Sequence, residues 1–345
     1  MKKIIFILVC IAGATASNAQ DIGQILAGSK PDANKYLQNY LEPFGKGEIL
    51  NMGRGWFNTA RVHKRLGFDV TISAQLALIP DSKQNFAFNN SDYATFKLKT
   101  GTSATIPTFI GDAGQQALTV NTTVDGKSVS YEFNTPSGIG KDFKNSVGFV
   151  AVPLPVAQLG VGIFKNTELK LRYFPKTSFS GTQVGVFGLA VQNEIGNYIP
   201  VFKRLPFLHL SALAGYNTVN VDYDLTGKGT PGANQKAQLR INAFTLQAIG
   251  SVKLAFFEVY TSLGYTTGKA HTDLKGSYVI TYKDNTSGGT YSTTVVDPIA
   301  LSYDNSGISN TWGARINLFF LKIFADYTFA PTYNGAGAGI AFSFR

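Results

Sequence analysis

The end of the chain, from Asn334 to Arg345, alternates strictly between two faces. Every second position is apolar: Ala336, Ala338, Ile340, Phe342 and Phe344. Most of the positions between them hold glycine or serine. Successive side chains leave a β-strand on opposite sides, so a period of two predicts a strand with one apolar face. A chain that combines such strands with an export signal is predicted to be an outer-membrane β-barrel.

The N-terminus has the features of a secretory signal peptide. Lys2 and Lys3 precede an apolar run over residues 4–12, and the small residues 17–19 predict cleavage before Gln20. The run is too short for a membrane-spanning helix, which needs about 20 residues. Cys10, the only cysteine, lies within this signal. We therefore expect neither a disulfide framework nor a cysteine-based metal site in the mature chain.

Composition favours a barrel over other classes of exported protein. The chain is 44% hydrophobic and 13% aromatic, with 15% charged residues and 36 glycines, whereas the usual charged share is about 25%. Nowhere in the sequence do 18 apolar residues follow one another, so no transmembrane helix is expected. A secreted β-sandwich would also alternate and is kept as an alternative. The formal charge of +10 is scattered along the chain, which indicates anionic surroundings and not nucleic acid.

Ten segments alternate clearly after Gly67: 67–78, 157–164, 168–174, 183–191, 208–222, 236–250, 256–266, 309–319, 323–329 and 335–344. The link from Pro80 to Val152 adds residues 93–99 and a hairpin at Asp125-Gly126. Bacterial single-chain barrels have an even number of strands, and we predict 12–14. Short turns at 165–167, 251–253 and 320–322 alternate with links at 80–152, 225–235 and 268–307. That rhythm is typical of outer-membrane barrels and not of sandwiches.

The segment before the barrel does not alternate. Residues 31–44 are predicted to form an amphipathic helix with Ser29 as its cap and Pro31 in its first turn. One face of this helix carries the predicted plug residues: Tyr36, Leu37, Tyr40, Leu41 and Phe44. Residues 45–55 are expected to be irregular. The predicted organisation is a signal peptide at 1–19, an N-terminal helical plug or hatch at 20–60, and a barrel at 61–345. A periplasmic leader that only orders at the barrel mouth is the alternative.

Several short segments resemble a known family. Residues 153–162 (PLPVAQLGVG), 165–169 (KNTEL) and 172–175 (RYFP), together with 56–60 (WFNTA) and Ile199-Pro200, look like those of an uncharacterised family of outer-membrane barrels from Bacteroidota. The resemblance spans nearly the whole mature chain. That family is distantly similar to the FadL-type long-chain fatty-acid transporters, which pair a 14-strand barrel with an N-terminal hatch. The resemblance implies a barrel with a hatch.

The sequence offers little for catalysis. Its three histidines are His63, His209 and His271. His209 and Ser211 share one strand face, but residues i and i+2 on a strand lie roughly 7 Å apart, too far for a nucleophile and its base. No zinc-type spacing is present, and Asp222 and Asp224 lack an EF-hand loop. We expect no enzyme, no metal and no cofactor.

The inward rows of the predicted strands carry the candidate lumen-lining residues: Asp69, Glu168, Lys170, Arg172, His209, Arg240, Glu258, Arg315 and Asp326. These residues either select solutes and hold the plug, or simply pair with one another in a lumen that is polar in any case. The expected function is a passive channel or transporter for small molecules, hydrophobic ones among them. The alternative is a closed structural barrel whose outer loops bind partners. Expected partners are outer-membrane lipid, a small hydrophobic or anionic ligand, and the barrel-assembly machinery during biogenesis.

Overall fold

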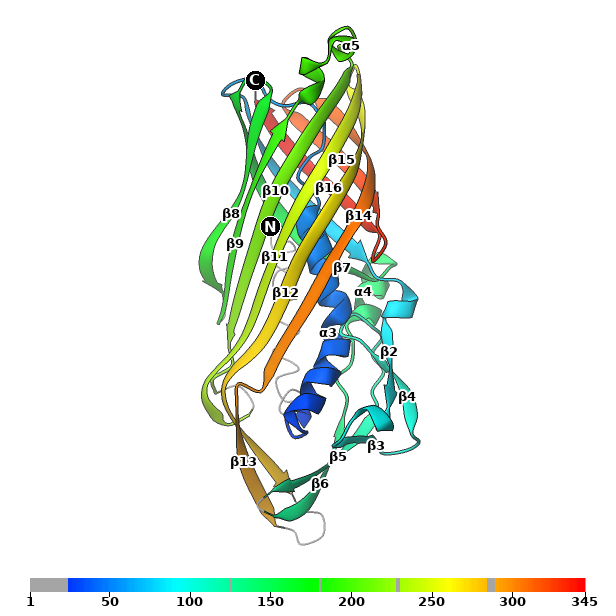
Figure 1. Cartoon of the computed structure of the whole chain (residues 1–345), viewed down its shortest axis with the longest axis vertical. Helices are drawn as coiled ribbons and strands as arrows, with labels where there is room; N and C mark the ends of the chain where they lie inside the picture. The colour runs from blue at the N-terminus through cyan, green and yellow to red at the C-terminus, as the bar shows by residue number, and fades with distance from the viewer. Residues whose placement is uncertain (1–23, 125, 180, 228–229, 284–288, 345) are drawn as a thin grey trace.

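The computed structural model describes residues 24–124, 126–179, 181–227, 230–283 and 289–344. The predicted signal peptide with Cys10 therefore lies outside the described residues. Strands and helices are labelled as in Figure 1.

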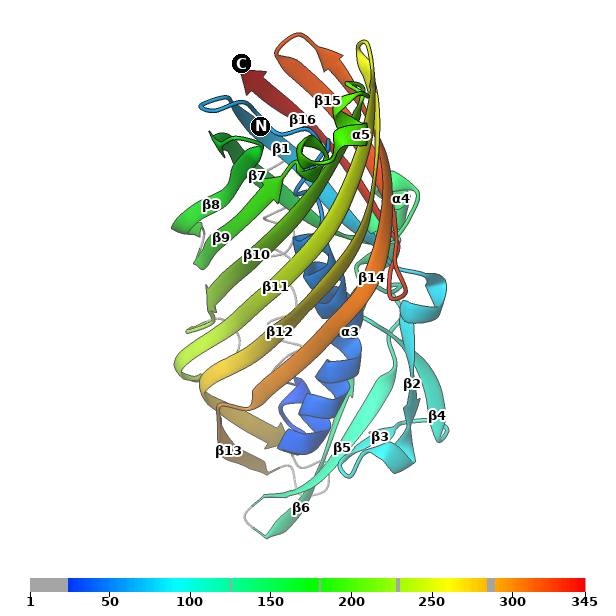
Figure 2. The ribbon, with the colours of Figure 1, turned by 45° about the horizontal axis from the view of Figure 1, so that its top comes forward.

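Antiparallel pairing closes ten strands into a ring (Figures 1 and 2). In chain order they are β1 (Phe68–Leu78), β7 (Ala151–Phe164), β8 (Thr167–Phe179), β9 (Thr182–Asn193), β10 (Leu208–Asp224), β11 (Gly232–Leu254), β12 (Phe257–Lys283), β14 (Ile299–Leu318), β15 (Leu321–Phe329) and β16 (Gly335–Phe344). Each pairs with the next, and β1 pairs with both β7 and β16. The predicted antiparallel β-barrel is thereby confirmed.

Among the described residues the ring has ten strands, fewer than the 12–14 expected. The additional strands of the long link pair outside the ring, in two small sheets. These sheets are formed by β2 (Asn85–Asn89) with β4 (Ser103–Pro107), and by β3 (Phe96–Leu98), β5 (Ala117–Val124) and β6 (Lys127–Asn134). β13 (Thr290–Val296) extends the main sheet from the far end of β12. Local alternation marks a strand but does not say which neighbour it pairs with, so the count was too high.

The longest strands reverse their polarity partway along. On β10 the outward side chains are apolar up to Tyr216, and beyond it they are polar, as at Asn220 and Asp222. The inward row changes in the opposite direction, from polar to apolar: Asn217 is followed on this row by Val219 and the buried Tyr223. The same reversal lies on the long-loop side of Phe244 on β11, Tyr265 on β12 and Ile308 on β14. An apolar belt around a polar lumen suits a bilayer, whereas the reversed part suits water outside and an apolar core inside.

That apolar core is built around α3 (Lys30–Gly53), which runs along the inner face of the long strands (Figure 1). The predicted plug residues Tyr36, Leu37 and Tyr40 are buried in it, while Leu41 and Phe44 are half-buried. The core also includes residues of the small sheets and of the reversed strands, among them Phe88, Phe96, Ile106, Leu118, Ile241, Leu274 and Tyr303. The helix is therefore fixed at the long-loop end by packing of the kind found in soluble domains.

The helix continues through the glycine-rich stretch that we expected to be irregular. A β-carbon on Gly45 would lie 2.8 Å from the Tyr303 ring, and one on Gly53 would lie 2.5 Å from the Thr266 hydroxyl. Glycine is present here because the helix lies against the wall, and not because the chain must bend. Tertiary packing thus overrides a weak helix propensity.

The remaining helices are short: α4 (Gly140–Val147), α5 (Pro200–Lys203) and the 3-10 turns η1 (Asp81–Lys83), η2 (Asn90–Asp92) and η3 (Ile195–Tyr198). η3 and α5 lie at the end of the barrel where β8 begins and β15 turns (Figure 1). Within the described ranges no helix combines the length and the apolarity needed to cross a membrane.

Candidate functional site: the plugged lumen

The chain between α3 and β1, residues 54–67, passes through the belt part of the barrel. Trp56 is 1% exposed, Phe57 is buried, and Ala60 lies against the inward Ser211 and Ser251. Because side chains from both the segment and the wall are buried at this level, water does not fill the lumen there. We call residues 52–63 the lumen segment.

Wall side chains hold the lumen segment by its main chain. Four carbonyls of the segment accept hydrogen bonds from amide or guanidinium groups of the wall: Met52 from Asn217 at 3.0 Å, Arg54 from Arg172 at 2.8 Å, Trp56 from Gln158 at 3.2 Å and Thr59 from Gln192 at 3.1 Å. The Ser211 hydroxyl donates to the Ala60 carbonyl, and the Ala60 amide donates to Ser251 at 3.2 Å. A buried extended segment without strand neighbours needs such partners.

Arg172 and Trp56 form the centre of this contact. The guanidinium carbon of Arg172 lies 3.6 Å from the Trp56 ring centroid, and Arg172 itself is only 2% exposed. A weakly hydrated guanidinium stacks well on an indole. The ring is accommodated because β9 and β10 present glycines, Gly188 and Gly215, whose β-carbons would lie 3.1 and 3.2 Å from it.

A second set of polar contacts joins the lumen segment to β12 and β14. The Thr59 hydroxyl donates to the buried Glu258, and Arg315 is 3.5 Å from the same carboxylate. Arg315 also donates to the Asn58 side chain at 2.5 Å. Two side chains of the lumen segment thus complete an ion pair of the wall.

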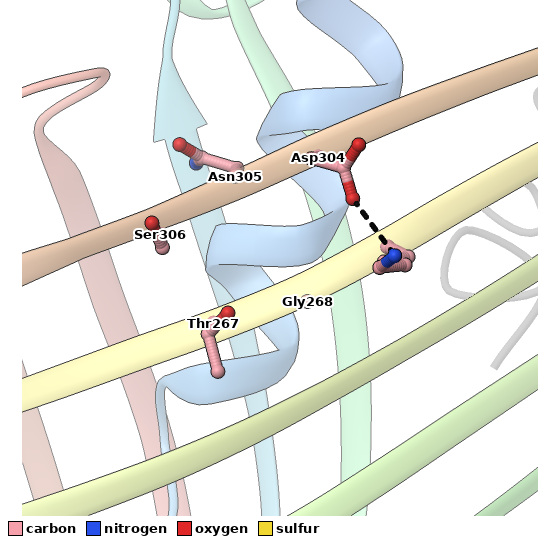
Figure 3. Close-up of a pocket in the computed structure, with 6 residues that line it drawn as sticks. Thr267, Gly268, Asp304, Asn305 and Ser306 are labelled. Carbon is pink, nitrogen blue, oxygen red and sulfur yellow. Dashed lines mark ion pairs between the residues drawn. The ribbon is translucent and has the colours of Figure 1, made fainter.

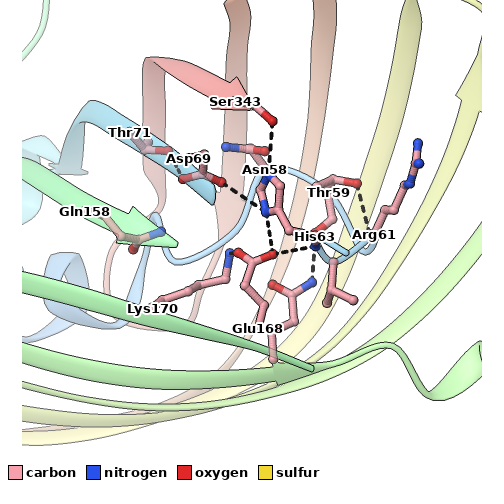
Figure 4. A network of polar contacts seen from close by, with 12 residues as sticks. Asn58, Thr59, Arg61, His63, Asp69, Thr71, Gln158, Glu168, Lys170 and Ser343 are labelled. Carbon is pink, nitrogen blue, oxygen red and sulfur yellow. Dashed lines mark hydrogen bonds and ion pairs between the residues drawn. The ribbon is translucent and has the colours of Figure 1, made fainter. Parts of the chain in front are cut away.

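His63 fixes the far end of the segment (Figure 4). Its main-chain N–H donates to Glu168 at 2.9 Å, and its Nδ1 lies 2.8 Å from the same oxygen. Its Nε2 lies 2.9 Å from the Ser343 hydroxyl on the last strand. Lys170 is paired with Glu168 at 2.7 Å, and Asp69 Oδ2 is 3.8 Å from His63 Nδ1. This cluster ties the segment to β1, β8 and β16.

The same cluster is the group of described residues whose arrangement could hold a metal. Ligand atoms of His63, Asp69 and Glu168 lie within 4.8 Å of one another. One imidazole with two carboxylates suits a divalent transition metal. In this structure, however, the Lys170 ammonium supplies a positive charge at Glu168. We therefore interpret the cluster as an ion-pair lock.

The predicted lumen-lining residues divide into two groups. Most are inside the barrel: Asp69, Glu168, Lys170, Arg172 and Glu258 are buried, and His209, Arg315 and Asp326 are partly buried. Arg240 is instead on the outer surface beyond the apolar belt, where it pairs with Asp222 at 2.5 Å. Arg240 stands on the same outward row as Phe244, and on the long-loop side of Phe244 this row is polar.

His209 and Ser211 have separate partners. His209 Nδ1 lies 2.6 Å from Glu194, whereas Ser211 donates to the Ala60 carbonyl. Neither residue engages the other, and both contribute to packing around the lumen segment.

The sequence prediction of a plug at residues 20–60 includes most of the lumen segment but not its extended course or three of its wall partners, Gln158, Gln192 and Asn217. Asn217 could have been found, because it shares the inward row of His209 and Ser211, whereas Gln158 and Gln192 stand in rows of small and apolar residues. The course of the segment could not, because an extended chain held by side chains has no periodicity of its own.

The wall is incompletely paired between β7 and β8. The two strands pair only from Leu159–Phe164 to Thr167–Leu171, so residues 151–158 and 172–179 have no ladder partner across this seam. The main chain of Gly162 on β7 is hydrogen-bonded to Leu66 and Gly67 on the β1 side. The main-chain N–H and C=O groups of the odd-numbered residues of β7 therefore face β8.

Prolines occupy the edges of this seam. Pro153 and Pro155 are odd-numbered and therefore present no N–H to β8, and Pro175 lies on the unpaired part of β8. The seam begins where the β7–β8 pairing ends, beside the exposed residues Ala157 and Tyr173. The exposed Lys176 lies farther along β8, toward the long-loop end. The seam thus opens at the outer edge of the apolar belt and cannot readily close by strand pairing.

A shallow depression of about 320 Å³ lies between β12 and β14, on the long-loop side of the belt (Figure 3). Lys269 and Asp304, 3.6 Å apart, cross it on the outer surface. Both side chains are largely exposed, so the depression is an open surface feature and not a binding cavity.

Comparison with known proteins places the sequence in one family. Residues 1–344 match DUF6588, described as a family of unknown function. A search of curated proteins gave no match.

Solved structures similar to the chain are bacterial outer-membrane proteins. The COG4313 outer membrane channel from Pseudomonas putida F1 is 10% identical with a TM-score of 0.37, covering 84% of this chain and 100% of the other. The translocator domain of the autotransporter NalP from Neisseria meningitidis is 11% identical with a TM-score of 0.24, covering 82% and 90%. The outer membrane protease OmpT from Escherichia coli is 10% identical with a TM-score of 0.26, covering 81% and 97%. The fold assignment rests on strand pairing and not on these likenesses.

Proposed function

The chain belongs to DUF6588, a family of unknown function, and we propose that it is an outer-membrane β-barrel that passes small molecules when its lumen segment is displaced. The closed ring and its apolar belt support a place in a bilayer. The predicted export signal supports the outer membrane.

The contacts that hold α3 and the lumen segment inside the barrel support this proposal. At the long-loop end, α3 is held by a buried apolar core. In the belt, by contrast, the lumen segment combines a much smaller apolar cluster around Trp56 and Phe57 with hydrogen bonds from wall side chains to its main chain. Water can replace the neutral bonds of this set at a net cost of about 0.5–1.5 kcal/mol each, whereas it cannot replace apolar packing. The lumen segment is therefore the part of the plug suited to reversible release.

The seam between β7 and β8 favours apolar molecules as the cargo. It is bordered by prolines and opens beside the apolar belt. A molecule that enters from the long-loop end can reach lipid there without crossing the charged lumen. Polar solutes would instead need the axial path past Arg172 and Glu168.

A reversible tether tests the hatch. The hydroxyls of Thr59 and Ser251 lie 3.5 Å apart across the lumen, so the variant Thr59→Cys/Ser251→Cys is placed for a disulfide. The sequence has no cysteine besides Cys10, so no other thiol competes. We expect channel conductance to be lost on oxidation and restored by dithiothreitol. Uptake of the apolar probe N-phenyl-1-naphthylamine by proteoliposomes, which would use the seam, is expected to persist.

Each single-cysteine variant serves as the control and is expected to be insensitive to oxidation. Equal conductance of the oxidised and reduced double variant would rule out the hatch. No transport in any form would favour the alternative, a closed barrel whose folded outer sheets bind partners. Replacing Pro153 and Pro155 with valine and threonine separates the routes, because restored N–H donors let β7 pair with β8 and should reduce probe uptake but not ion conductance.

A further inference from the structure

At the short-turn end of the barrel, three of the strand turns have a lysine in the turn or within three residues of it. Lys165 lies in the β7–β8 turn, Lys253 precedes the β11–β12 turn, and Lys322 follows the β14–β15 turn. Lys64 and Arg65 precede β1 at the same end, and Arg204 follows α5. These positions lie together because antiparallel strands return every second connection to one end of the ring.

An exposed aromatic ring accompanies the cation in each of the three turns. Phe164 is 71% exposed beside Lys165, Phe256 is 67% exposed near Lys253, and Phe319 is 93% exposed near Lys322. Rings of this kind occur where the hydrocarbon of a bilayer meets its headgroups. Lys165 lies beside Phe164 in its turn, whereas Lys253 and Lys322 continue the inward rows of Ser251 and Asp326 at the barrel mouth. From the last residues of a strand a long lysine stem can still extend its ammonium to the phosphate layer.

The positive charge of this end is not neutralised by neighbouring exposed carboxylates within the described residues. The acidic side chains nearby, Glu168, Glu194 and Glu258, are buried and engaged with the lumen segment or with His209. At the opposite end, by contrast, surface cations pair with carboxylates, as in Lys269 with Asp304. The excess charge is therefore specific to the short-turn end.

We propose that this end binds the phosphate headgroups of anionic phospholipids through a cationic rim formed by Lys64, Arg65, Lys165, Arg204, Lys253 and Lys322. The aromatic rings in the same turns favour a lipid over a soluble anion, because they need hydrocarbon beneath the phosphate. The inference goes beyond transport and requires only that the barrel lies in a bilayer. Attraction of this kind adds up over several basic residues.

Native mass spectrometry of the full-length mature chain with an equimolar mixture of phosphatidylglycerol and phosphatidylcholine tests the rim. We expect the wild type to retain phosphatidylglycerol in about tenfold excess, and Lys165→Gln/Lys253→Gln/Lys322→Gln to retain it in less than about twofold excess. The matched control Lys236→Gln/Lys269→Gln/Lys275→Gln removes the same charge from the opposite end and should keep the wild-type preference. A heat-modifiability gel verifies that every variant is folded.

Equal retention of the two lipids by the wild type would overturn the proposal, as would an unchanged preference in the rim variant or its loss in the control. Glycerol 3-phosphate distinguishes the source of the phosphate. Displacement of phosphatidylglycerol by this soluble ester would show that the rim recognises free phosphate and would overturn lipid as the partner. Resistance to displacement supports it. Because no transport is measured, these outcomes are independent of the hatch.

Discussion

Replacing Arg172 with methionine should open the barrel, because this side chain contacts the lumen segment at the Met52 carbonyl, the Arg54 carbonyl and the Trp56 ring. In the closed state its guanidinium stacks 3.6 Å from the Trp56 ring, donates to the Arg54 carbonyl at 2.8 Å and donates to Gln158 at 3.1 Å. Methionine retains the length and apolar stem of the side chain but none of these contacts. The carbonyl of Arg54 then remains buried without this donor.

The magnitude follows from these contacts. A desolvated cation–π contact contributes about 2 kcal/mol, and a hydrogen bond from a charged group contributes roughly 1.5–3 kcal/mol. Desolvation of the guanidinium in the closed state offsets part of this sum. A net loss of about 3 kcal/mol lowers the ratio of closed to open barrels by about 150-fold.

Single-channel recording in planar bilayers measures this ratio as the open probability. The control is Arg240→Met, which removes an arginine that pairs with Asp222 on the outer surface and should leave the open probability unchanged. A change of less than about threefold in Arg172→Met, in protein shown to be folded, would refute the view that wall-to-segment contacts keep the barrel closed.

Three further predictions concern the plug. Burial raises the pKa of Glu48 on α3 from 4.5 to about 8, so the docked helix binds this proton more tightly than the unfolded chain does. The contribution of Glu48 to stability is therefore full below pH 4.5 and falls as the pH rises toward 8. The thermal midpoint in detergent should fall over this range in the wild type and should fall less in Glu48→Gln. The same dependence of the midpoint on pH in both proteins would contradict the prediction. Gly53→Ala should lower the same midpoint through a cost of about 1–3 kcal/mol, because its β-carbon would meet Thr266 at 2.5 Å, while Gly114→Ala, with open space around it, should have little effect. His63→Ala should speed tryptic cleavage after Lys64 by about tenfold through the loss of the imidazole contacts with Glu168 and Ser343; His271→Ala, at an exposed position, is the control, and equal cleavage rates would argue against the ion-pair lock.

The barrel was predictable because alternation is a local property that each strand carries in full. The terminal strand shows this, since its apolar row from Ala336 to Phe344 is the outward face in the structure. Arg240 shows the limit of the same reasoning. Alternation continues unchanged through β11, but the surroundings of its two faces are exchanged on the long-loop side of Phe244. A period of two contains no mark of where a strand leaves the bilayer.

The site was less predictable than the fold, because its contacts join distant parts of the chain. Glu168, Lys170 and Arg172 were identified as one inward row, but their partners His63, Arg54 and Trp56 lie about a hundred residues earlier. The glycines at 45–53 predict irregular chain, but in the structure they permit close packing of a helix. Such close approaches are decided by the neighbouring wall, which the local sequence does not describe.

The course of the plug through the ring constrains the order of assembly. α3 begins at the long-loop end, where Asn34 donates to the Pro298 carbonyl, and the lumen segment leaves at the opposite end beside Ser343. The chain that precedes β1 therefore runs through a ring that is closed by pairing of β1 with β16. A helix about 10 Å wide cannot easily be drawn through a completed ring that it fills. We therefore expect β1 to pair with β16 around a plug that is already in place.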